Sequence, residues 1–358
     1  MRVLVLTPYP YGTVPGPRSS FELWERVLAE AGITLDYAVF ESDRLHEILY
    51  LDGHAREKAL EMARSYARLV ASAGRAEEYD AVLVNREASL IGPALIERWV
   101  ARRGTPLIYL LDDPLYISYR SPSNGLLSYL KCFGKVKTLC RISRTVIANS
   151  PSNSSFARNH NANVWEIPCV VDGDLYTGWA PRPSSASDVC VGWTGSPSTA
   201  PNLQLIRAPL RALAARDDVR LRFIGGSDFA MPEVAHATVP WRAETEVEDL
   251  RRLDIGLLPL PLTPWTPHKF YLKLIQYMAL GIPPVATPLG SNSLVIEDGT
   301  TGFLARDDRG WVTAVESLID DPGLRERMGK GAADEALRRY TLQANAERIV
   351  AAFRSAVG

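Results

Sequence analysis

The sequence predicts an α/β protein made of two doubly wound, Rossmann-like domains that face a central cleft. Short apolar runs alternate with longer segments of helical periodicity, which is typical of parallel α/β layering. A Gly-, Pro- and Ser-rich stretch separates two sets of such runs, and 358 residues are enough chain for two cores. A ligand of this fold is expected at the carboxyl ends of the strands.

The first set of strands alternates with clear helical segments. One helix is expected over Phe21–Ala31, with Ser19 or Ser20 as its cap, and a longer one over residues 55–73. Together with the strands, these helices form a predicted domain of residues 1–171. The expected strands are Arg2–Leu6, Leu35–Phe40, Ala81–Val84, Leu107–Leu111, Thr145–Ala148 and Val164–Ile167.

The second set of strands follows a predicted linker of residues 172–188, which has little apolar periodicity. It forms a predicted domain of residues 189–340, and residues 341–358 continue as a last helix. The expected strands are Val189–Trp193, Arg220–Ile224, Ile255–Leu258, Pro284–Ala286 and Gly302–Leu304, and the closing helices are Trp311–Ile319, Asp321–Lys330 and 332–357.

Charge and composition argue against several classes of protein. The formal net charge of −1 provides no general basic field, so no nucleic-acid partner is expected. Four cysteines without a CxxC pair or zinc-like spacing fit a reduced, cytoplasmic chain. The first apolar run is too short for a signal peptide, and none reaches the roughly 18 residues of a spanning helix.

Residues 126–144 mix Leu, Tyr and Phe with several cations. Such a segment either makes a peripheral membrane contact or forms the basic face of an ordinary domain helix. The domain helix is the preferred interpretation.

Residues 266–281 predict a helix that begins at an anion site. Thr266 is a good N-cap residue and Pro267 suits the first helical position. The free backbone N–H groups of the first turn would then point at an anion, and Gly281 would end the helix.

The polar side chains of this helix could bind a diphosphate. Lys269 and Lys273 are four residues apart and would share one helix face, with Gln276 on nearly the same side. His268, in the first turn, could contact a sugar or a phosphate. The alternative is an ordinary amphipathic helix whose lysines and histidine lie in solvent.

A second phosphate cradle is expected in the loop after Val189–Trp193. Gly192, Gly195 and Ser196 would form it, although a plain turn would have the same residues. Trp241 could lie near a nucleobase or pack in the core.

Two carboxylates directly follow strand Leu107–Leu111. Asp112 and Asp113 could bind sugar hydroxyls or stabilise an oxocarbenium-like centre, or Asp112 could cap the turn before Pro114. No third oxygen ligand is evident in the sequence, so no metal is expected.

Other polar residues at strand ends are candidates for binding an acceptor. Asn85 and Arg86 end one strand, although Arg86 could instead pair with Glu87 or Asp113. Arg18, in the Pro-rich loop after the first strand, could meet an acceptor or the diphosphate.

Several longer segments carry a family resemblance. They are KLIQYMALGIPPVATPLGSN, EDGTTGFLA (297–305), VCVGWTGSPSTAPNLQLI (189–206), NREASLIGPALIERWVARRGTPLIYLLDD (85–113) and VIANS (146–150). In order and spacing they resemble the GT-B glycosyltransferases of family four, the group 1 glycosyl transferases, in a branch with GSPST and KLxQYMAxG motifs.

The resemblance implies a retaining, metal-independent, hexosyltransferase-like enzyme without a separate cofactor. Its donor would be a UDP- or GDP-sugar, and the departing phosphate would accept the proton of a hydroxyl acceptor. The acceptor could be a glycan, a lipid-linked molecule or a natural product. The resemblance also implies that residues 189–340 bind the donor, that the first domain binds the acceptor, and that the last helix returns toward the first domain.

The sequence departs from the family pattern at two places. The glutamates of the usual E-x7-E spacing are replaced by His268 and Gln276, and the Arg…Lys pair after the glycine loop is missing. Phosphate neutralisation would then depend on Lys269 and Lys273. These departures keep a non-catalytic binding or regulatory subunit open as an alternative. A nucleotide-sugar epimerase is a third, less favoured because Asp112 and Asp113 are expected to point apart.

Overall fold

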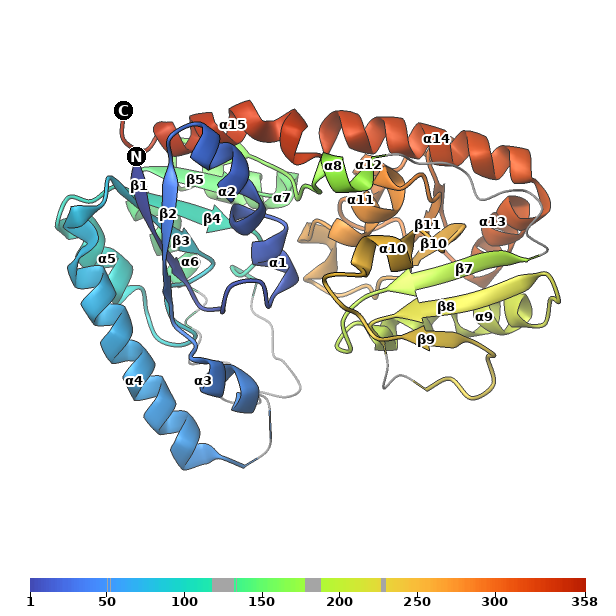
Figure 1. The fold of residues 1–358 in the computed structure, drawn as a ribbon, viewed down its shortest axis with the longest axis horizontal. Helices are drawn as coiled ribbons and strands as arrows, with labels where there is room; N and C mark the ends of the chain where they lie inside the picture. Colours follow the sequence, from blue (N-terminus) through green and yellow to red (C-terminus); the bar gives the residue numbers. More distant parts are fainter. Residues whose placement is uncertain (50, 52, 118–131, 133, 178–187, 227–229) are drawn as a thin grey trace. The chain divides into compact units, whose positions relative to one another are not determined.

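In a computed structural model of the protein, two parallel sheets account for all of the strands described (Figure 1). The structure describes residues 1–49, 51, 53–117, 132, 134–177, 188–226 and 230–358. The chain divides into a first unit, Met1–Cys169 with Asn345–Gly358, and a second unit, Val170–Ala344. The segment predicted as a linker therefore starts inside the second unit, where α8 (Gly173–Tyr176) forms.

The first unit contains a parallel sheet of order β2-β1-β3-β4-β5-β6. The chain enters the sheet at β1, adds β2 on one side, and then continues with β3 on the other side of β1. The strand order thus reverses between β1 and β3. The strands are β1 (Arg2–Thr7), β2 (Thr34–Val39), β3 (Ala81–Asn85), β4 (Leu107–Leu111), β5 (Thr145–Ala148) and β6 (Val164–Glu166), so all six predicted strands of this half are confirmed.

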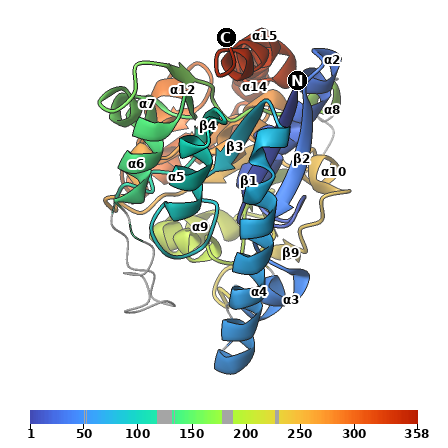
Figure 2. The same ribbon diagram turned by 90° about the vertical axis from the view of Figure 1, so that its left-hand side faces the viewer.

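Helices fill the connections between these strands. The described helices of the first unit are α1 (Pro15–Arg18), α2 (Phe21–Glu30), α3 (Asp43–Ile48), α4 (Ala55–Gly74), η1 (Ala76–Glu78), α5 (Leu95–Arg102), α6 (Lys135–Ile142) and α7 (Pro151–Arg158), with most of α15 (Leu342–Arg354). Helices α4 and α5 pack side by side, as Figure 2 shows.

Both faces of the first sheet are buried. Leu4 and Leu6 of β1 belong to a core that also contains Leu69 of α4, Val100 of α5 and Leu139 of α6. Val3 and Val5, which alternate with them along β1, point to the opposite face and are also fully buried. The continuous apolar runs that predicted these strands therefore result from packing on two sides.

The second unit contains a parallel sheet of order β12-β11-β10-β7-β8-β9. Its strand order reverses between β7 and β10, as in a doubly wound nucleotide-binding fold. The strands are β7 (Val189–Thr194), β8 (Val219–Ile224), β9 (Ala237–Val239), β10 (Ile255–Leu258), β11 (Pro284–Ala286) and β12 (Phe303–Leu304). The edge strand β9 was not predicted, because its three residues are mostly exposed and form no apolar run.

The remaining helices cover this second sheet. They are η3 (Ala200–Ile206), α9 (Arg207–Ala214), α10 (Glu246–Leu250), η4 (Thr266–His268), α11 (Leu272–Ala279), α12 (Asn292–Val295), α13 (Asp308–Asp320) and α14 (Pro322–Arg339). One core joins β7, β8 and β10 to α9 and α13, including Trp193, Leu210 and Leu318.

The break between the last two helices was predicted in the wrong place. Helix α14 runs through Gly331, and the helical pattern ends only at Tyr340. Glycines lie inside this helix without ending it. A Cβ added at Gly329 would lie 2.3 Å from the carbonyl oxygen of Gly281, so Gly329 permits close packing of the helix against that residue. The real break occurs where Val171 pairs with Thr341 in an isolated bridge.

Candidate functional site

Each sheet reverses its strand order at one place, and ligands of such folds bind outside the carboxyl ends of the strands there. In the second unit this place lies between β7 and β10, and in the first unit between β1 and β3. We call the polar residues around the first of these points, among them Thr199, Lys273 and Gln276, the second-unit site. Those around the other point, among them Arg86, Asp112 and Asp113, form the first-unit site.

The second-unit site is built where β7 ends beside α11. The backbone N–H of Thr194, the last residue of β7, donates to the hydroxyl of Tyr277 on α11 at 2.9 Å. Tyr277 also lies against β10, because a Cβ added at Gly256 would be 2.6 Å from its ring. This buried tyrosine therefore fixes α11 relative to β7 and β10.

Lys273 is the central charged group of this site. Its Nζ donates to Thr199 Oγ1 at 3.1 Å and lies 4.5 Å from the centre of the Trp193 ring. Burial, and then the charge of Lys269, lower the pKa of Lys273 to about 7. In the part of the chain that the structure describes, Lys273 has no carboxylate partner. A partly buried cation next to a second cation is an environment that an anion would stabilise.

Gly195 borders Lys273 closely. A Cβ at Gly195 would lie 2.3 Å from Lys273 Nζ and 2.3 Å from the Trp193 ring. Glycine is therefore required for the lysine to occupy this position. Gly192, in contrast, lies inside β7, and a Cβ there would meet Leu253, so its predicted place in a phosphate loop is wrong.

Ser196 follows Gly195 in the exposed part of this loop. Its hydroxyl forms hydrogen bonds with those of Ser198 and Thr199, at 2.9 and 3.3 Å. Since Thr199 also accepts from Lys273, the loop that carries Ser196 contacts this lysine.

The helix predicted to begin at Thr266 begins at Leu272 instead. Residues Thr266–His268 form a separate 3-10 turn, and Lys269 has an extended backbone with φ −91° and ψ 145°. Lys269 and Lys273 therefore do not share a helix face as predicted. Their ammonium groups still interact, because the charge of Lys269 lowers the pKa of Lys273.

The loop around Gly290 explains why this helix starts late. The Ser291 hydroxyl accepts from the Tyr271 N–H at 3.3 Å and donates to the Lys269 carbonyl at 3.3 Å. A Cβ at Gly290, where φ is +57°, would lie 2.9 Å from the Thr266 carbonyl. These backbone groups find partners outside a helix, which overrides the local N-cap signal.

Gln276 was predicted on a polar helix face, but it is buried, with 4% of its surface exposed. Its Nε2 donates to the Tyr176 hydroxyl at 2.9 Å and to Glu246 Oε1 at 3.1 Å. Trp241 Nε1 donates to the same Glu246 oxygen at 3.0 Å. Glu246, the first residue of α10, was not among the predicted site residues, since its contact with Gln276 depends on tertiary packing.

His268 lies half-buried in the 3-10 turn and not in the first turn of α11. Pro267 precedes it, and the turn is held by Thr266 Oγ1, which donates to the Pro261 carbonyl at 2.6 Å.

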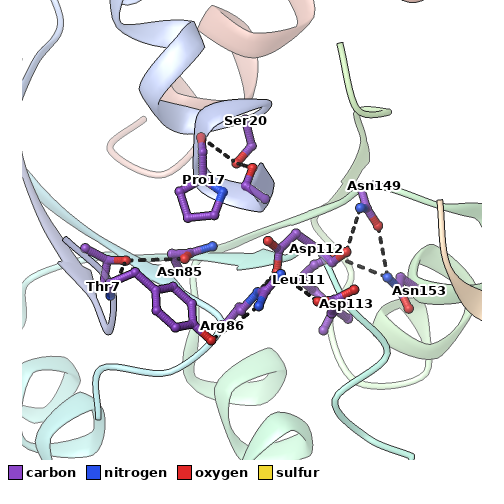
Figure 3. Close-up of polar contacts among 12 residues, drawn as sticks. Thr7, Pro17, Ser20, Asn85, Arg86, Leu111, Asp112, Asp113, Asn149 and Asn153 are labelled. Carbon is purple, nitrogen blue, oxygen red and sulfur yellow. Dashed lines mark hydrogen bonds and ion pairs between the residues drawn. The ribbon is translucent and has the colours of Figure 1, made fainter. Parts of the chain in front are cut away.

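The first-unit site is centred on one partly buried arginine, Arg86 (Figure 3). Arg86 Nε lies 2.8 Å from Asp112 Oδ1, and Arg86 Nη2 lies 2.5 Å from Asp113 Oδ2. Burial alone would lower the pKa of Arg86, but the charges of the two aspartates raise it well above its ordinary value. The two carboxylates thus converge on one guanidinium, and the expectation that they point apart is wrong.

Arg86 adopts a left-handed backbone, with φ +57°. A Cβ added at Gly16 would lie 2.8 Å from Arg86 Nη2 and 2.9 Å from Asp112 Oδ2. The backbone of α1 therefore lies directly on the ion pairs. Strain in a non-glycine residue at a strand end is often found at functional sites.

Neighbouring amides complete the first-unit site. Asn85 is fully buried at the end of β3; its Oδ1 accepts from Thr7 Oγ1 at 3.4 Å, and its Nδ2 has no partner among the described residues. Asn149 Nδ2 donates to the Asp112 carbonyl at 2.6 Å and so holds the end of β4 (Figure 3).

Arg18 is the last residue of α1 and is half-buried. Ser19 and Ser20 do not cap the next helix with their side chains, because both hydroxyls donate to the Gly16 carbonyl, at 3.1 and 2.9 Å. The predicted cap at Ser20 is thus correct in position but not in hydrogen bonding.

Among the described residues, the structure has neither a metal-binding cluster nor a helix that could span a membrane. No cluster of three or more His, Cys, Asp or Glu side chains there could hold a metal ion. No described helix has the length and apolar character needed to cross a membrane. Of the predicted basic segment, residues 126–131 and 133 lie outside the description, and Lys135 is buried in an ion pair with Glu87.

Comparison with known proteins gives a family match for part of the second unit. Residues 189–321, which include all of the second-unit site except Tyr176, match the family model described as Glycosyl transferases group 1. A D-inositol 3-phosphate glycosyltransferase of Corynebacterium diphtheriae is 27% identical over 239 residues, covering 59% of this chain and 56% of that protein. An alpha-D-kanosaminyltransferase of Streptomyces kanamyceticus is 33% identical over 102 residues, covering 28% of this chain and 26% of that protein. The chain spans about half the length of the curated relatives it matches.

Solved structures match the whole chain. Sucrose-phosphate synthase of Thermosynechococcus elongatus superposes with a TM-score of 0.71 at 15% identity, covering 99% of this chain and 98% of that one. Anabaena HepE in complex with UDP-glucose gives a TM-score of 0.71 at 16% identity, covering 99% and 100%. The chain thus has the GT-B fold, and residues 189–321 of it match the group 1 glycosyl transferases.

Proposed function

We propose that this protein is a glycosyltransferase that moves a sugar from a nucleoside diphosphate sugar to a hydroxyl acceptor. The observation that carries the proposal is Lys273, a partly buried cation without a carboxylate partner among the described residues, at the strand-order reversal of the matched domain. Such a group suits an anionic ligand whose negative charge increases as the sugar leaves.

The diphosphate would bind between Lys273, Thr199 and the loop at Gly195. A bound diphosphate favours the protonated form of Lys273, which strengthens the contact as negative charge develops on the leaving group. A lysine contact to a charged oxygen contributes about 1.5–3 kcal/mol. Lys269 would add a second positive charge.

The donor base is proposed to be uracil or guanine. Support for uracil comes from HepE, a structural neighbour that was solved with UDP-glucose. Trp241, beside Gly225, is the aromatic side chain proposed to lie near the base.

The acceptor is proposed to bind at the first-unit site. Arg86, Asp112 and Asp113 form a cluster with two negative charges and one positive charge, which can accept hydrogen bonds from sugar hydroxyls. Asn85 Nδ2 adds a buried donor. An acceptor could be a glycan, a lipid-linked molecule or a natural product with a free hydroxyl.

We propose a retaining, metal-independent transfer. The leaving phosphate itself would accept the acceptor proton on the same face of the sugar, so no enzyme nucleophile is needed. Asp112 and Asp113 would stabilise positive charge at the anomeric carbon, and no step requires a cofactor.

A non-catalytic subunit is the second candidate, because His268 and Gln276 occupy positions where the resembled family has glutamates. It would bind a nucleotide sugar without turnover. The epimerase is less favoured, since both aspartates are engaged by Arg86 and neither is placed as an independent general acid or base.

The test is to incubate the purified chain with UDP-, GDP- and TDP-sugars, with and without a panel of hydroxyl acceptors, and to measure nucleoside diphosphate release. We expect release from one donor, with a product that retains the anomeric configuration. Binding without release or transfer would favour the non-catalytic subunit, and release of a free epimerised sugar nucleotide would favour the epimerase.

A further inference from the structure

We propose that Trp193 is a positioning residue of the second-unit site, whose ring supports the positive charge of Lys273 without neutralising it. The inference rests on the function proposed above, because it takes the diphosphate of the donor as the ligand of Lys273. In the sequence, Trp193 is only the last residue of a predicted strand.

The Lys273 ammonium group lies over the Trp193 ring. Its Nζ is 4.5 Å from the ring centre, within the distance of about 6 Å over which an aromatic face attracts a cation. Among the aromatic side chains, tryptophan attracts a cation most strongly. A side chain at Gly195 would collide with both groups, since its Cβ would lie 2.3 Å from the ring and 2.3 Å from Nζ.

The core of the second unit holds the ring in place. Trp193 is 1% exposed and belongs to the same core cluster as Leu203 of η3 and Phe223 of β8. Phe223 is also its neighbour in the register of β7 with β8. The ring therefore cannot turn away from Lys273 without disturbing this packing.

The other interactions of Lys273 give its charge little support. Burial and the charge of Lys269 both lower the pKa of Lys273, to about 7, and Lys269 is the ionisable group among the described residues whose charge acts on it. Thr199 Oγ1 accepts one hydrogen bond from Nζ at 3.1 Å. Within the described part of the chain, the ring and this hydroxyl are the contacts that favour the charged form.

An aromatic ring supports a cation in a way that suits an anionic ligand. A carboxylate partner would neutralise Lys273 and would compete with the diphosphate for its N–H groups. The face of a ring attracts the charge and adds no negative charge that would repel a phosphate. Trp193 therefore keeps a cation ready for the diphosphate where a carboxylate would block it.

The first measurement is the titration of Lys273 in the full chain without nucleotide. It is followed by NMR of protein labelled with ¹³C at the lysine Cε, and Lys273→Met assigns the signal. The variants are Trp193→Leu, which removes the ring, and Trp193→Phe, which keeps a smaller one. The control is Trp311→Leu, which removes a buried tryptophan of α13 from the same core and leaves the ring at Lys273 in place.

We expect Trp193→Leu to lower the titration midpoint of Lys273 by about half a pH unit, Trp193→Phe to lower it less, and the control to leave it unchanged. Entry of water in place of the ring would raise the midpoint instead. A raised or unchanged midpoint in Trp193→Leu would therefore overturn the inference. If that variant does not fold, the midpoint in Trp193→Phe decides by the same signs.

The second measurement is calorimetric titration of the same proteins with UDP-glucose at pH 6 and pH 8.5, or with GDP-glucose if the wild type does not bind UDP-glucose. At pH 6 Lys273 is mostly protonated in each protein, so Trp193→Leu should bind nearly as tightly as wild type. At pH 8.5 it should bind about threefold more weakly, the factor that corresponds to half a pH unit. An equal loss at both pH values would show that Trp193 is merely structural.

The two proposals fail differently. A wild-type chain that binds a nucleoside diphosphate sugar, with Lys273 titrating alike in the presence and absence of the Trp193 ring, refutes the role of Trp193 and leaves the proposed function intact. A wild-type chain that binds neither UDP-glucose nor GDP-glucose refutes the proposed function and the inference with it, even if the ring shifts the titration of Lys273.

Discussion

At the scale of single residues, the position of Lys273 decides the chemistry of the second-unit site. Its ammonium group is covered by Trp193, Gly195 and Thr199, and burial lowers its pKa to about 7. Near neutral pH the empty site therefore holds a partly protonated lysine, and an anion would complete its protonation.

Nucleotide-sugar binding is expected to tighten as the pH falls from 8.5 to 6. A bound diphosphate raises the pKa of Lys273, so binding takes up a proton above about pH 7. Calorimetric titration with UDP-glucose measures this, since its diphosphate has no proton to lose in this range. The pH dependence of the binding constant should vanish in Lys273→Met. An unchanged pH dependence in that variant would disprove the assignment of Lys273 to the diphosphate site.

Lys273 also makes the free energy of unfolding depend on pH. An unfolded lysine has a pKa of about 10.4. Between about pH 7 and that value the unfolded chain binds more protons at this residue, so its contribution makes the free energy of unfolding rise with pH. Below about pH 7 both states are protonated and the contribution is constant.

The sequence singled out Lys273, Arg86, Asp112 and Asp113, because each lies in or beside a segment with strand-end or helix-start signals. It could not reveal that Lys273 lies over the Trp193 ring, or that both aspartates converge on Arg86. Those facts depend on residues that are far apart in the chain.

At the scale of elements, Tyr277 joins α11 to the ends of β7 and β10. Its hydroxyl accepts from the Thr194 N–H and donates to the Leu257 carbonyl at 3.4 Å. A change at Tyr277 should therefore alter the positions of Lys273, on the same helix, and of Gly195, next to Thr194.

Tyr277→Phe is expected to lower the free energy of unfolding by about 1–3 kcal/mol, because it leaves the buried Thr194 N–H without an acceptor. It should also weaken nucleotide binding. Chemical denaturation and titration measure the two effects.

A matched control is Tyr109→Phe in the first unit, which removes a buried hydroxyl that has no partner among the described residues. Its stability should be unchanged or higher. Equal losses in the two variants would contradict the role given to the Tyr277 hydroxyl.

Most strands were predictable because each is a short apolar run buried on both faces. The start of α11 was not, although Thr266 and Pro267 have the right local preferences. The loop at Gly290 and Ser291 supplies partners for the backbone there, and tertiary contacts decided the outcome.

At the scale of the whole molecule, the chain consists of two units with separate cores, and its last residues return to the first unit. Phe353 near the end of α15 is fully buried and packs edge to face with Trp24 of α2, with ring centres 6.5 Å apart. The end of the chain therefore stabilises the first unit directly.

Phe353→Ala is expected to destabilise the first unit by about 3–5 kcal/mol. Hydrogen exchange read by mass spectrometry should show loss of protection in β1 and β3, with β7 and β10 retained. Leu318→Ala removes a buried side chain from the core of the second unit. It should reduce protection in β7 and β10 and leave β1 and β3 protected. Equal loss of protection in both sheets from either change would contradict two separate cores.

The two-domain architecture could be predicted from the alternation of strands and helices and the polar stretch between them. The division near Val170 could not be placed to the residue, because α8 packs into the second unit from within that polar stretch.

The most direct test of the central claim is a titration of wild type, Lys273→Met and Lys330→Met with nucleoside diphosphates. Lys330 is an exposed lysine of the same unit, so its variant controls for net charge. We expect saturable binding by wild type and Lys330→Met, and at least tenfold weaker binding by Lys273→Met, equivalent to about 1.4 kcal/mol. Equal affinity in all three proteins would contradict a diphosphate site at Lys273.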